Sequence, residues 1–313
     1  MPGEKWKALF QRFWPAYRRW YLREGEAARP GYVSCRKALR KYMPELESTY
    51  DELVELAGGG DLEARFLSLY RPPPFLTACS QGVWRGAEPA LIRNYDYDPA
   101  LSEGITLRSA WREQEVICMT DCMWGALDGI NSAGLVASLA FGGRRAVGDG
   151  FGMPLILRYV LEVCESTRDA VKVLRRVPTH MAYNVTVVDR TGAFATLFLS
   201  PDRAPVVTQR PLATNHQRRV EWKEYAGATA SLERERYLGE RLEDESETLD
   251  SLIQRFLRAP LYSAQFQKGW GTLYTASYRA REGSAEYHWP GGSVLQDFEN
   301  FREVSVRVDY PRD

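Results

Sequence analysis

The sequence lacks any apolar run as long as the roughly 18 residues that suggest a membrane-spanning helix. It also lacks a signal-peptide core at its start, because Lys5, Lys7 and Arg12 interrupt the apolar residues there. Neither charge is in excess: Lys plus Arg and Asp plus Glu both total 41 among 313 residues, so the formal net charge is zero. A dedicated nucleic-acid-binding protein usually has a basic excess. We therefore expect a cytoplasmic protein with no integral membrane segment and no nucleic-acid partner.

Cysteine and histidine are scarce, with five and three residues respectively. The cysteine number is odd and low for this length, so a disulfide framework is not expected and at least one cysteine is a candidate for chemistry. Cys118 and Cys122 have no matching pair at zinc-binding spacing, and His180, His216 and His288 are far apart. A Walker-type phosphate loop is also missing. The sequence predicts no metal site and no cofactor.

Helical periodicity dominates the first 70 or so residues. Aromatic residues recur at helical spacing between Trp6 and Tyr21, which predicts an aromatic stripe on one helix face. Packing on the protein's own core or on an interface is favoured for this stripe over insertion into a membrane surface. A second helix is predicted over residues 34–56, and the proline run that ends at Pro74 closes the helical part of the chain.

Beyond the prolines, short β-rich runs alternate with turn residues and are followed by pairs of helices. The predicted strands are 75–83, 90–95, 116–119, 123–131, 135–141, 184–189, 193–199, 205–208, 212–214, 272–278, 285–289 and 304–308, and the predicted helices are 154–164, 167–176, 217–243 and 249–257. Ser166 is the predicted N-cap of the 167–176 helix, and the charged run 233–247 is expected to be a solvated helix face. Strands do not alternate singly with helices, as a doubly wound parallel sheet requires. This order predicts an α+β fold with two sheets covered by helix layers.

Four polar segments of the β-rich part are candidates for chemistry. They are Cys79 itself, Arg93-Asn94-Tyr95-Asp96, the run from Asp128 to Leu135, and Thr214-Asn215-His216. Each alone has an ordinary explanation: a small buried cysteine, a surface ion pair, a hairpin turn and a helix cap. The signal therefore lies in their order along the chain.

In this order the segments resemble the N-terminal-nucleophile (Ntn) hydrolases of the penicillin V acylase and choloylglycine hydrolase type, and most of all the isopenicillin-N acyltransferase branch. That family has a nucleophilic Cys, an Arg-Asn-x-Asp segment, an Asp-Gly-x-Asn-x-x-Gly-Leu hairpin and a later Thr-Asn. The resemblance covers about residues 75–310. It implies a four-layer αββα sandwich of two mainly antiparallel sheets over residues 79–313, preceded by a helical leading segment of residues 1–78.

The resemblance also implies roles for particular residues. The family's nucleophile must be the first residue of its chain, so that the free α-amino group can act as base for the thiol. A precursor that cleaves its own Ala78–Cys79 bond is therefore implied. Arg93 would favour the thiolate, and Asp96 would orient the new amino group. Asn215 would donate its side-chain amide to the oxyanion.

Further positions follow from the same resemblance. Ala140 stands where the family has a second oxyanion donor; only its backbone N–H could serve, so bile-salt hydrolase activity is not expected. Arg279 corresponds to a late catalytic arginine. An apolar acyl pocket could be lined by the aromatic residues Trp84, Tyr95, Trp124 and Phe141, although core packing explains at least half of them equally well.

The expected function is hydrolysis of a linear amide, or transfer of its acyl group to an amine, through a thioester on Cys79. The expected partner is then a small-molecule amide or acyl substrate. The sequence leaves open whether the protein forms a homo-oligomer. Two alternatives stand beside this function. One is a Cys–His hydrolase that uses Cys79 with His180, His216 or His288 and is not self-cleaved. The other is a protein that keeps the fold uncleaved and acts in binding or as a structural protein.

Overall fold

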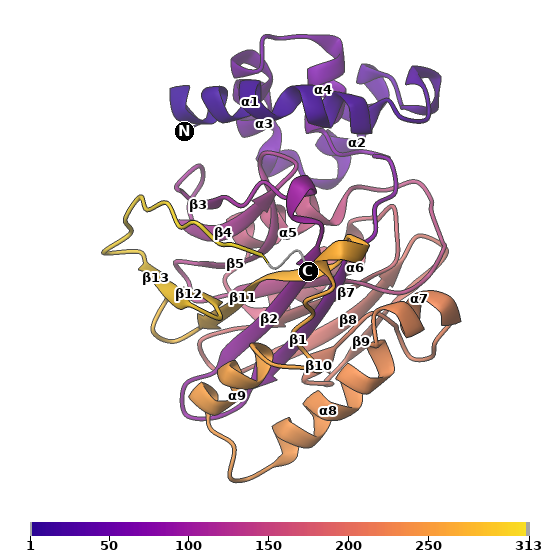
Figure 1. Ribbon diagram of the computed structural model, residues 1–313. Helices are drawn as coiled ribbons and strands as arrows, with labels where there is room; N and C mark the ends of the chain where they lie inside the picture. Colours follow the sequence, from indigo (N-terminus) through magenta and orange to yellow (C-terminus); the bar gives the residue numbers. More distant parts are fainter. Residues whose placement is uncertain (1, 311–313) are drawn as a thin grey trace.

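The computed structural model describes residues 2–310. Two antiparallel sheets pack face to face, and helices cover their outer faces (Figure 1). One sheet has six strands in the order β10-β1-β2-β11-β12-β13, and the other has seven strands in the order β3 to β9. The α+β sandwich of two antiparallel sheets that the sequence predicts is confirmed.

Most strands lie close to their predicted positions, but residues 106–109 and 292–297 form strands that the sequence did not predict. The six-stranded sheet consists of β1 (Ala78–Trp84), β2 (Ala90–Tyr97), β10 (Leu212–Ala213), β11 (Gly271–Arg279), β12 (Ser284–Trp289) and β13 (Gly292–Asp297). The seven-stranded sheet consists of β3 (Thr106–Ser109), β4 (Val116–Asp121), β5 (Gly125–Asn131), β6 (Val136–Phe141), β7 (Tyr183–Val188), β8 (Phe194–Ser200) and β9 (Arg203–Thr208). Most side chains of β1, β2, β5 and β6 are buried, because each of these strands has a sheet on one face and a helix layer on the other.

Helices α5 (Met153–Val163) and α6 (Thr167–Arg176) lie on the seven-stranded sheet. Close packing of α5 on β5 depends on glycine, since a Cβ atom at Gly125 would lie 2.5 Å from Cβ of Pro154. Ser166 caps α6 as predicted, with its Oγ accepting the Asp169 N–H. The six-stranded sheet is covered by α8 (Ser231–Glu243) and α9 (Leu249–Phe256), and the short α7 (Lys223–Ala228) precedes them.

The leading segment forms a helical unit at one end of the sandwich (Figure 1). Its helices are α1 (Glu4–Tyr21), α2 (Tyr32–Tyr42), α3 (Glu47–Leu56) and α4 (Asp61–Leu67). The single helix predicted over 34–56 is wrong, because Pro44 cannot continue α2 and α3 starts afresh after it. The aromatic stripe of α1 packs inward: Trp6 and Phe10 are buried, and Trp6 Nε1 donates to the Met123 carbonyl at 3.0 Å.

One predicted strand is wrong. Residues 304–308 form no strand, and Val304 and Val306 are 55% and 49% exposed. β13 forms this edge of the sheet and pairs with β12, and residues 304–308 do not add a further strand to it. Among residues 2–310, none of the helices has the length and apolar character needed to cross a membrane.

Candidate active site

Cys79 is the second residue of β1, and its side chain is fully buried between the two sheets. Its strand partner is Tyr95 of β2. Residues opposite each other in an antiparallel pair point to the same face, and alternate residues share that face. Arg93 therefore lies on the face of Cys79, whereas Ala78 and its partner Asp96 point to the other face.

The Arg93 guanidinium is the cationic group that contacts the thiol. Its Nη2 lies 3.3 Å from Cys79 Sγ, and its Nε donates to the Leu139 carbonyl at 3.0 Å. Its Nη1 pairs with the Asp128 carboxylate and lies 2.9 Å from the Tyr274 hydroxyl. All three guanidinium nitrogens of Arg93 thus have a partner, and these contacts hold Nη2 against the sulfur.

In the intact chain, burial opposes ionisation of the Cys79 thiol. Burial raises the pKa of the Cys79 thiol above its usual value; the Arg93 charge opposes this rise and Asp96 adds to it. Arg93 therefore acts in the expected direction, but burial is the larger effect. A proton acceptor is needed before the sulfur can attack, because the thiolate is the nucleophilic form.

Asn215 follows β10 and contacts the peptide unit at the start of the predicted mature chain. Its Oδ1 accepts the Cys79 backbone N–H at 3.0 Å, and its Nδ2 donates to the Phe141 carbonyl at 3.2 Å. The Cys79 nitrogen is the atom that would become the α-amino group. A side-chain amide thus lies beside the Ala78–Cys79 bond.

Asp96 lies on the other face of β2, opposite Ala78. Its carboxylate pairs with Arg234 of α8 at 2.5 Å and accepts the Thr272 hydroxyl at 2.6 Å. Among the described residues, no hydrogen bond joins Asp96 to Cys79. Asp96 is therefore next to the predicted cleavage point but is bound to Arg234 in the uncleaved chain.

Arg279 is not brought to this centre. It pairs with Ala90 on β2, whereas Tyr274 of the same strand β11 pairs with Tyr95. At ~3.4 Å per residue, Arg279 lies roughly 17 Å along the strand from the level of Cys79. Its side chain forms an ion pair with Asp250 at 3.2 Å. The strand register thus gives Arg279 a surface ion pair in place of a contact with the thiol.

Ala140 is not positioned as an oxyanion donor. It pairs with Asn184 of β7, and the Gly142 N–H donates to the Ala182 carbonyl two residues further along the same ladder. Hydrogen-bonded pairs alternate in an antiparallel ladder, so the Ala140 N–H points at β7. The Ala140 N–H, which the resemblance assigned to the oxyanion, is therefore hydrogen-bonded within the sheet.

The four aromatic residues expected in an acyl pocket are distributed through the core. Tyr95 lies beside Cys79, and its ring is 4.8 Å from the Arg93 guanidinium. The Phe141 ring packs edge-on against Tyr225. Trp84 lies at the far end of β1, and Trp124 is buried with its Nε1 donating to the Leu67 carbonyl. None of the four lines the main cavity described below.

A Cys–His pair does not form within residues 2–310. The histidine rings bind other groups: His180 lies 3.2 Å from the Phe151 carbonyl, His216 lies 2.8 Å from Ser231 Oγ, and His288 lies 2.8 Å from Ser277 Oγ. The hydrogen-bond contacts of Cys79 Sγ are with Arg93 and Thr77. No cluster of three or more metal-ligating His, Cys, Asp or Glu side chains comes together in this part of the chain either.

A chain of polar groups stands behind Asn215. Ser231 Oγ accepts the Asn215 backbone N–H at 2.9 Å and lies 2.8 Å from His216 Nδ1, while His216 Nε2 lies 3.2 Å from Glu235. Ser231 opens α8, directly after Ala230 in the left-handed conformation with φ 48°. Sequence reasoning assigned His216 to the start of a helix and did not find this arrangement.

Two residues that support the site, Arg234 and Tyr225, were missed as functional candidates, and Asp128 was named only as part of a candidate segment without a role of its own. Asp128 holds Arg93, Arg234 holds Asp96, and the Tyr225 hydroxyl donates to the Thr77 carbonyl at 2.5 Å. Asp128 was visible as an acidic residue in an otherwise apolar strand. A charged residue at such a position needs a partner when it is buried, and this was the available signal.

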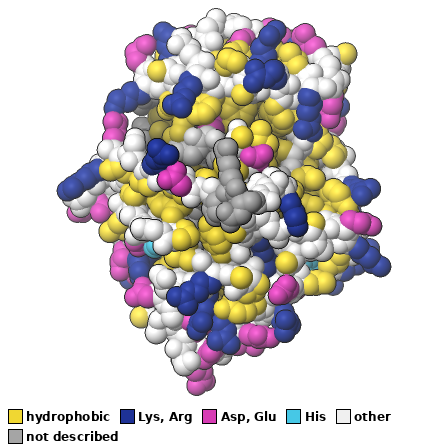
Figure 2. Space-filling view, viewed as in Figure 1, with side chains coloured by type: hydrophobic (Ala, Val, Ile, Leu, Met, Phe, Trp, Pro, Cys, Tyr) yellow, Lys and Arg dark blue, Asp and Glu magenta, His cyan; other side chains and the backbone are white. Residues whose placement is uncertain are grey.

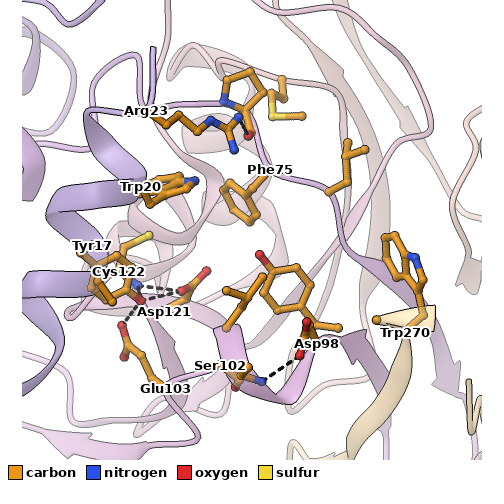
Figure 3. Close-up of a pocket in the computed structure, with 18 of the residues that line it drawn as sticks. Tyr17, Trp20, Arg23, Phe75, Asp98, Ser102, Glu103, Asp121, Cys122 and Trp270 are labelled. Atoms are coloured by element: carbon orange, nitrogen blue, oxygen red, sulfur yellow. Dashed lines mark hydrogen bonds between the residues drawn. The ribbon is translucent and has the colours of Figure 1, made fainter. Parts of the chain in front are cut away.

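A cavity of about 660 Å³ lies between α1 and the sandwich (Figure 3). Its walls include Tyr17 and Trp20 of α1, Phe75 of the segment before β1, and Tyr97 and Trp270 of the sandwich. Figure 2 shows hydrophobic side chains gathered in the hollow below the leading helices. A smaller cavity of about 290 Å³ includes Ala78 and Asp96, and Trp270 lines both cavities.

Comparison with known proteins identifies the family and the fold of the chain. Residues 84–293 match the family model of the acyl-coenzyme A:6-aminopenicillanic acid acyl-transferase. Penicillin V acylase from Agrobacterium tumefaciens has a similar structure, with a TM-score of 0.51 and 14% identity over 71% of this chain and 86% of that chain. A mutant of the conjugated bile acid hydrolase from Clostridium perfringens has a TM-score of 0.51 and 11% identity over 74% of this chain and 97% of that chain. No curated protein sequence matches the chain.

The two structural likenesses support the fold alone, since both identities are low. The family match begins shortly after Cys79, and it includes the Arg93, Asp96 and Asn215 segments and more than half of the chain. The chain therefore belongs to the acyl-coenzyme A:6-aminopenicillanic acid acyl-transferase family and has the fold of the Ntn hydrolases.

Proposed function

We propose that the protein is a cysteine Ntn enzyme that cuts its own Ala78–Cys79 bond and then acts on a linear amide through a thioester on Cys79. One observation carries this proposal. Cys79 Sγ lies 3.3 Å from the fixed Arg93 Nη2, and the backbone nitrogen of the same residue is bound by Asn215 Oδ1 at 3.0 Å. A nucleophile, a cation and an amide thus converge on one peptide unit.

Maturation would be an attack of Cys79 Sγ on the Ala78 carbonyl carbon. The C–N bond breaks, the thiol proton ends on the departing nitrogen, and a thioester joins Ala78 to the sulfur. Water then hydrolyses the thioester, which releases an Ala78 carboxylate and restores the thiol. The new α-amino group, with an ordinary pKa of about 7.7 to 8.0, becomes the base for that thiol.

The mature site would process a substrate amide by the same steps. The thiolate attacks the carbonyl, and Asn215 Nδ2 donates to the developing oxyanion. The amine leaves with a proton from the α-amino group, and water or a second amine takes the acyl group from sulfur. Asp96 would orient the α-amino group from the neighbouring strand.

Intact-mass analysis of the purified protein tests this proposal. The expected result is two chains, residues 1–78 and 79–313, whose summed mass exceeds that of the precursor by one water. A Cys79→Ala variant should remain a single chain. Cys118→Ala, which removes another buried thiol, should be cleaved like the wild type.

Processing of Cys79→Ala at the same bond would refute self-cleavage. A wild-type chain that stays intact and has no amidase activity would support a binding or structural role instead. An intact chain that is active and depends on a histidine would support the Cys–His alternative. The acyl-enzyme itself can be detected as a mass increase on Cys79 after a short exposure of the mature protein to an activated acyl ester.

A further inference from the structure

The segment that carries Asn215 has no regular secondary structure. β10 ends at Ala213, and residues 214–217 belong to neither a helix nor a strand, yet all four are buried. Backbone N–H and C=O groups that are buried outside helices and sheets need other hydrogen-bond partners. The position of Asn215 therefore depends on the groups that bind this piece of backbone.

Asn184 of β7 supplies two of these partners. Its Nδ2 donates to the Thr214 carbonyl at 2.8 Å and to the His216 carbonyl at 2.9 Å. A side-chain amide has two N–H donors, and both are used here on the carbonyls that flank Asn215. Asn184 is fully buried and belongs to the seven-stranded sheet, whereas Asn215 follows β10 of the six-stranded sheet. Asn184 thus ties the Asn215 segment to the opposite sheet.

Two further contacts complete the hold on Asn215. Ser231 Oγ accepts the Asn215 N–H at 2.9 Å. The backbone of Gly143 packs on the Asn215 carbonyl, since a Cβ atom at Gly143 would overlap that oxygen and the φ angle there is 65°. The backbone at Asn215 is therefore fixed by β7, by α8 and by the segment after β6.

The side chain of Asn215 depends on this fixed backbone. Its Oδ1 accepts the Cys79 N–H, and its Nδ2 donates to the Phe141 carbonyl. An oxyanion donor works only when it lies about 2.7–3.1 Å from the place where the negative oxygen forms. A small shift of the backbone at Asn215 would move Nδ2 out of that range.

We infer that Asn184 is a positioning residue, which holds the Asn215 amide where it stabilises the oxyanion formed in self-cleavage and in acylation by a substrate. This inference rests on the proposed function, in which Asn215 Nδ2 is the oxyanion donor. The amide is needed at position 184, because a carboxylate would place oxygen against two carbonyl oxygens and an aliphatic side chain has no donor. Asn184 acts through the backbone and not on the reacting atoms.

A purely structural role is the alternative that the test must separate. Asn94 and Asn131 are also fully buried, and each donates from Nδ2 to two carbonyls near the end of a helix, α9 and α5 respectively. Buried asparagine clamps therefore occur in this fold where they hold only helices. Stability alone cannot distinguish Asn184 from them, so the readout has to report on the oxyanion.

Two reagents that attack the same thiol provide this readout. p-Nitrophenyl acetate acylates Cys79 through a tetrahedral oxyanion, and p-nitrophenolate leaves when the thioester forms. Iodoacetamide alkylates the sulfur by direct displacement of iodide, with no oxyanion on the path. Asn215 can therefore assist the first reaction and not the second. Both rates are measured on the processed protein as the mass increase on the peptide that contains Cys79.

Gln296→Leu is the matched control for Asn184→Leu. Gln296 is buried, and its side-chain amide also makes two hydrogen bonds to an irregular segment, at the Arg302 carbonyl and N–H. It lies on β13, four strands from β1 in the six-stranded sheet. Both substitutions replace a buried amide by an aliphatic side chain, but only one of them is next to Asn215.

We expect Asn184→Leu to lower the maximal acylation rate at least tenfold and to leave alkylation within twofold of the wild type. Gln296→Leu should lower Tm and leave both rates within twofold. An equal fall of acylation and alkylation in Asn184→Leu, or an unchanged acylation rate, would overturn the inference. Wild-type protein that stays uncleaved and is not acylated on Cys79 would instead overturn the proposed function.

A double variant tests whether the effect passes through Asn215. In an Asn215→Ala background, Asn184→Leu should change acylation by less than twofold, because the amide that it positions is gone. A further tenfold loss in that background would overturn the inference. Variants that do not process themselves are produced as two co-expressed chains, residues 1–78 and residues 79–313, with the initiator methionine before Cys79 removed in the cell. If Asn184→Leu does not fold, Asn184→Ser is used, and a selective loss of acylation of at least threefold is expected.

Discussion

Ser231 Oγ accepts the backbone N–H of Asn215 at 2.9 Å, so the first residue of α8 holds the residue that contacts the predicted scissile peptide. The same hydroxyl lies 2.8 Å from His216 Nδ1, and the imidazole reaches Glu235 at 3.2 Å. Ser231 is fully buried. Its hydroxyl is therefore placed to position Asn215 rather than to meet a substrate.

Replacement of Ser231 by Ala should slow self-cleavage. The variant leaves the Asn215 N–H without its buried acceptor, which costs about 1–3 kcal/mol. This cost destabilises the position that Asn215 takes beside the scissile peptide. We expect a roughly tenfold lower rate, which corresponds to about 1.4 kcal/mol in the barrier. The rate is measured by intact mass over time after refolding. In the mature enzyme, kcat should fall while KM stays near the wild-type value.

Two further variants separate positioning from general destabilisation. Ser231→Thr keeps the hydroxyl and should recover most of the rate. Ser68→Ala removes another fully buried serine, whose Oγ donates to the Arg65 carbonyl at 2.7 Å in the leading segment. It should lower Tm without slowing cleavage. An equal slowing in both alanine variants would assign Ser231 a purely structural role.

Asp128→Asn should strongly destabilise the protein. Asp128 and Arg93 form an ion pair in which both side chains are fully buried. The substitution leaves the Arg93 charge uncompensated, which typically costs about 3–5 kcal/mol. The free energy of unfolding, from urea titration of the uncleaved Cys79→Ala background, provides the measurement.

Asp202→Asn is the matched surface variant. Asp202 pairs with Arg144, but its side chain is 50% exposed. Exposed pairs contribute about 0–1 kcal/mol, so this variant should lose far less stability than Asp128→Asn. Similar losses in the two variants would contradict the assignment of Arg93 and Asp128 as a buried anchor of the site.

Self-cleavage should accelerate as pH rises. Burial raises the pKa of the Cys79 thiol, with Arg93 opposing and Asp96 adding to the rise, so the thiolate is the minor form near neutrality. Below a raised pKa, the thiolate fraction grows about tenfold per pH unit. The cleavage rate between pH 6 and 9 should therefore increase with a slope that approaches one logarithmic unit per pH unit.

Cys79→Ser is the control for this dependence, since a serine hydroxyl does not titrate in that range. Its cleavage should be slower and flatter with pH. A wild-type rate that falls between pH 6 and 9 would show that another group, rather than the thiol, limits the reaction.

The order of the elements could be predicted because each leaves a local pattern. The run of prolines that ends at Pro74 marked the end of the leading helices, and β-rich runs marked most strands of both sheets. Cys79, Arg93 and Asn215 were found because their segments follow a family order, and the structure brings all three together. These features depend on short stretches of chain.

Features that depend on register or on distant partners could not be predicted. Arg279 lies well along β11 from the level of the thiol, a fact fixed by the pairing of β11 with β2. The Ala140 N–H is used by β7 for the same kind of reason. Arg234 lies in a charged run expected to be solvated, yet it is buried because Asp96 faces α8. No local pattern reports such pairings.

Asp121→Asn should stabilise the protein at alkaline pH. Burial and the nearby Glu103 raise the pKa of Asp121 from its ordinary 3.8 to about 7, so folding favours the protonated carboxyl. The resulting stability is fully present below about pH 4 and is lost as pH rises to about 7. Above that, the folded chain carries an unfavourable charge next to Glu103, and an amide in its place avoids this charge. Thermal unfolding at pH 8 should show a Tm higher by roughly 2–4 °C, with little or no gain at pH 4.

Asp202→Asn provides a control of the opposite sign for Asp121→Asn. Hydrogen bonds from Arg144 and Ser200 lower the pKa of Asp202, so its charged form is favoured in the folded chain. Loss of that charge should slightly lower Tm at pH 8, while Asp121→Asn raises it. If Asp121→Asn instead lowers Tm at pH 8, the carboxylate is stabilised where it stands. The Cys122 N–H at 2.9 Å and the Tyr17 hydroxyl at 3.0 Å are the groups that would then bind the carboxylate.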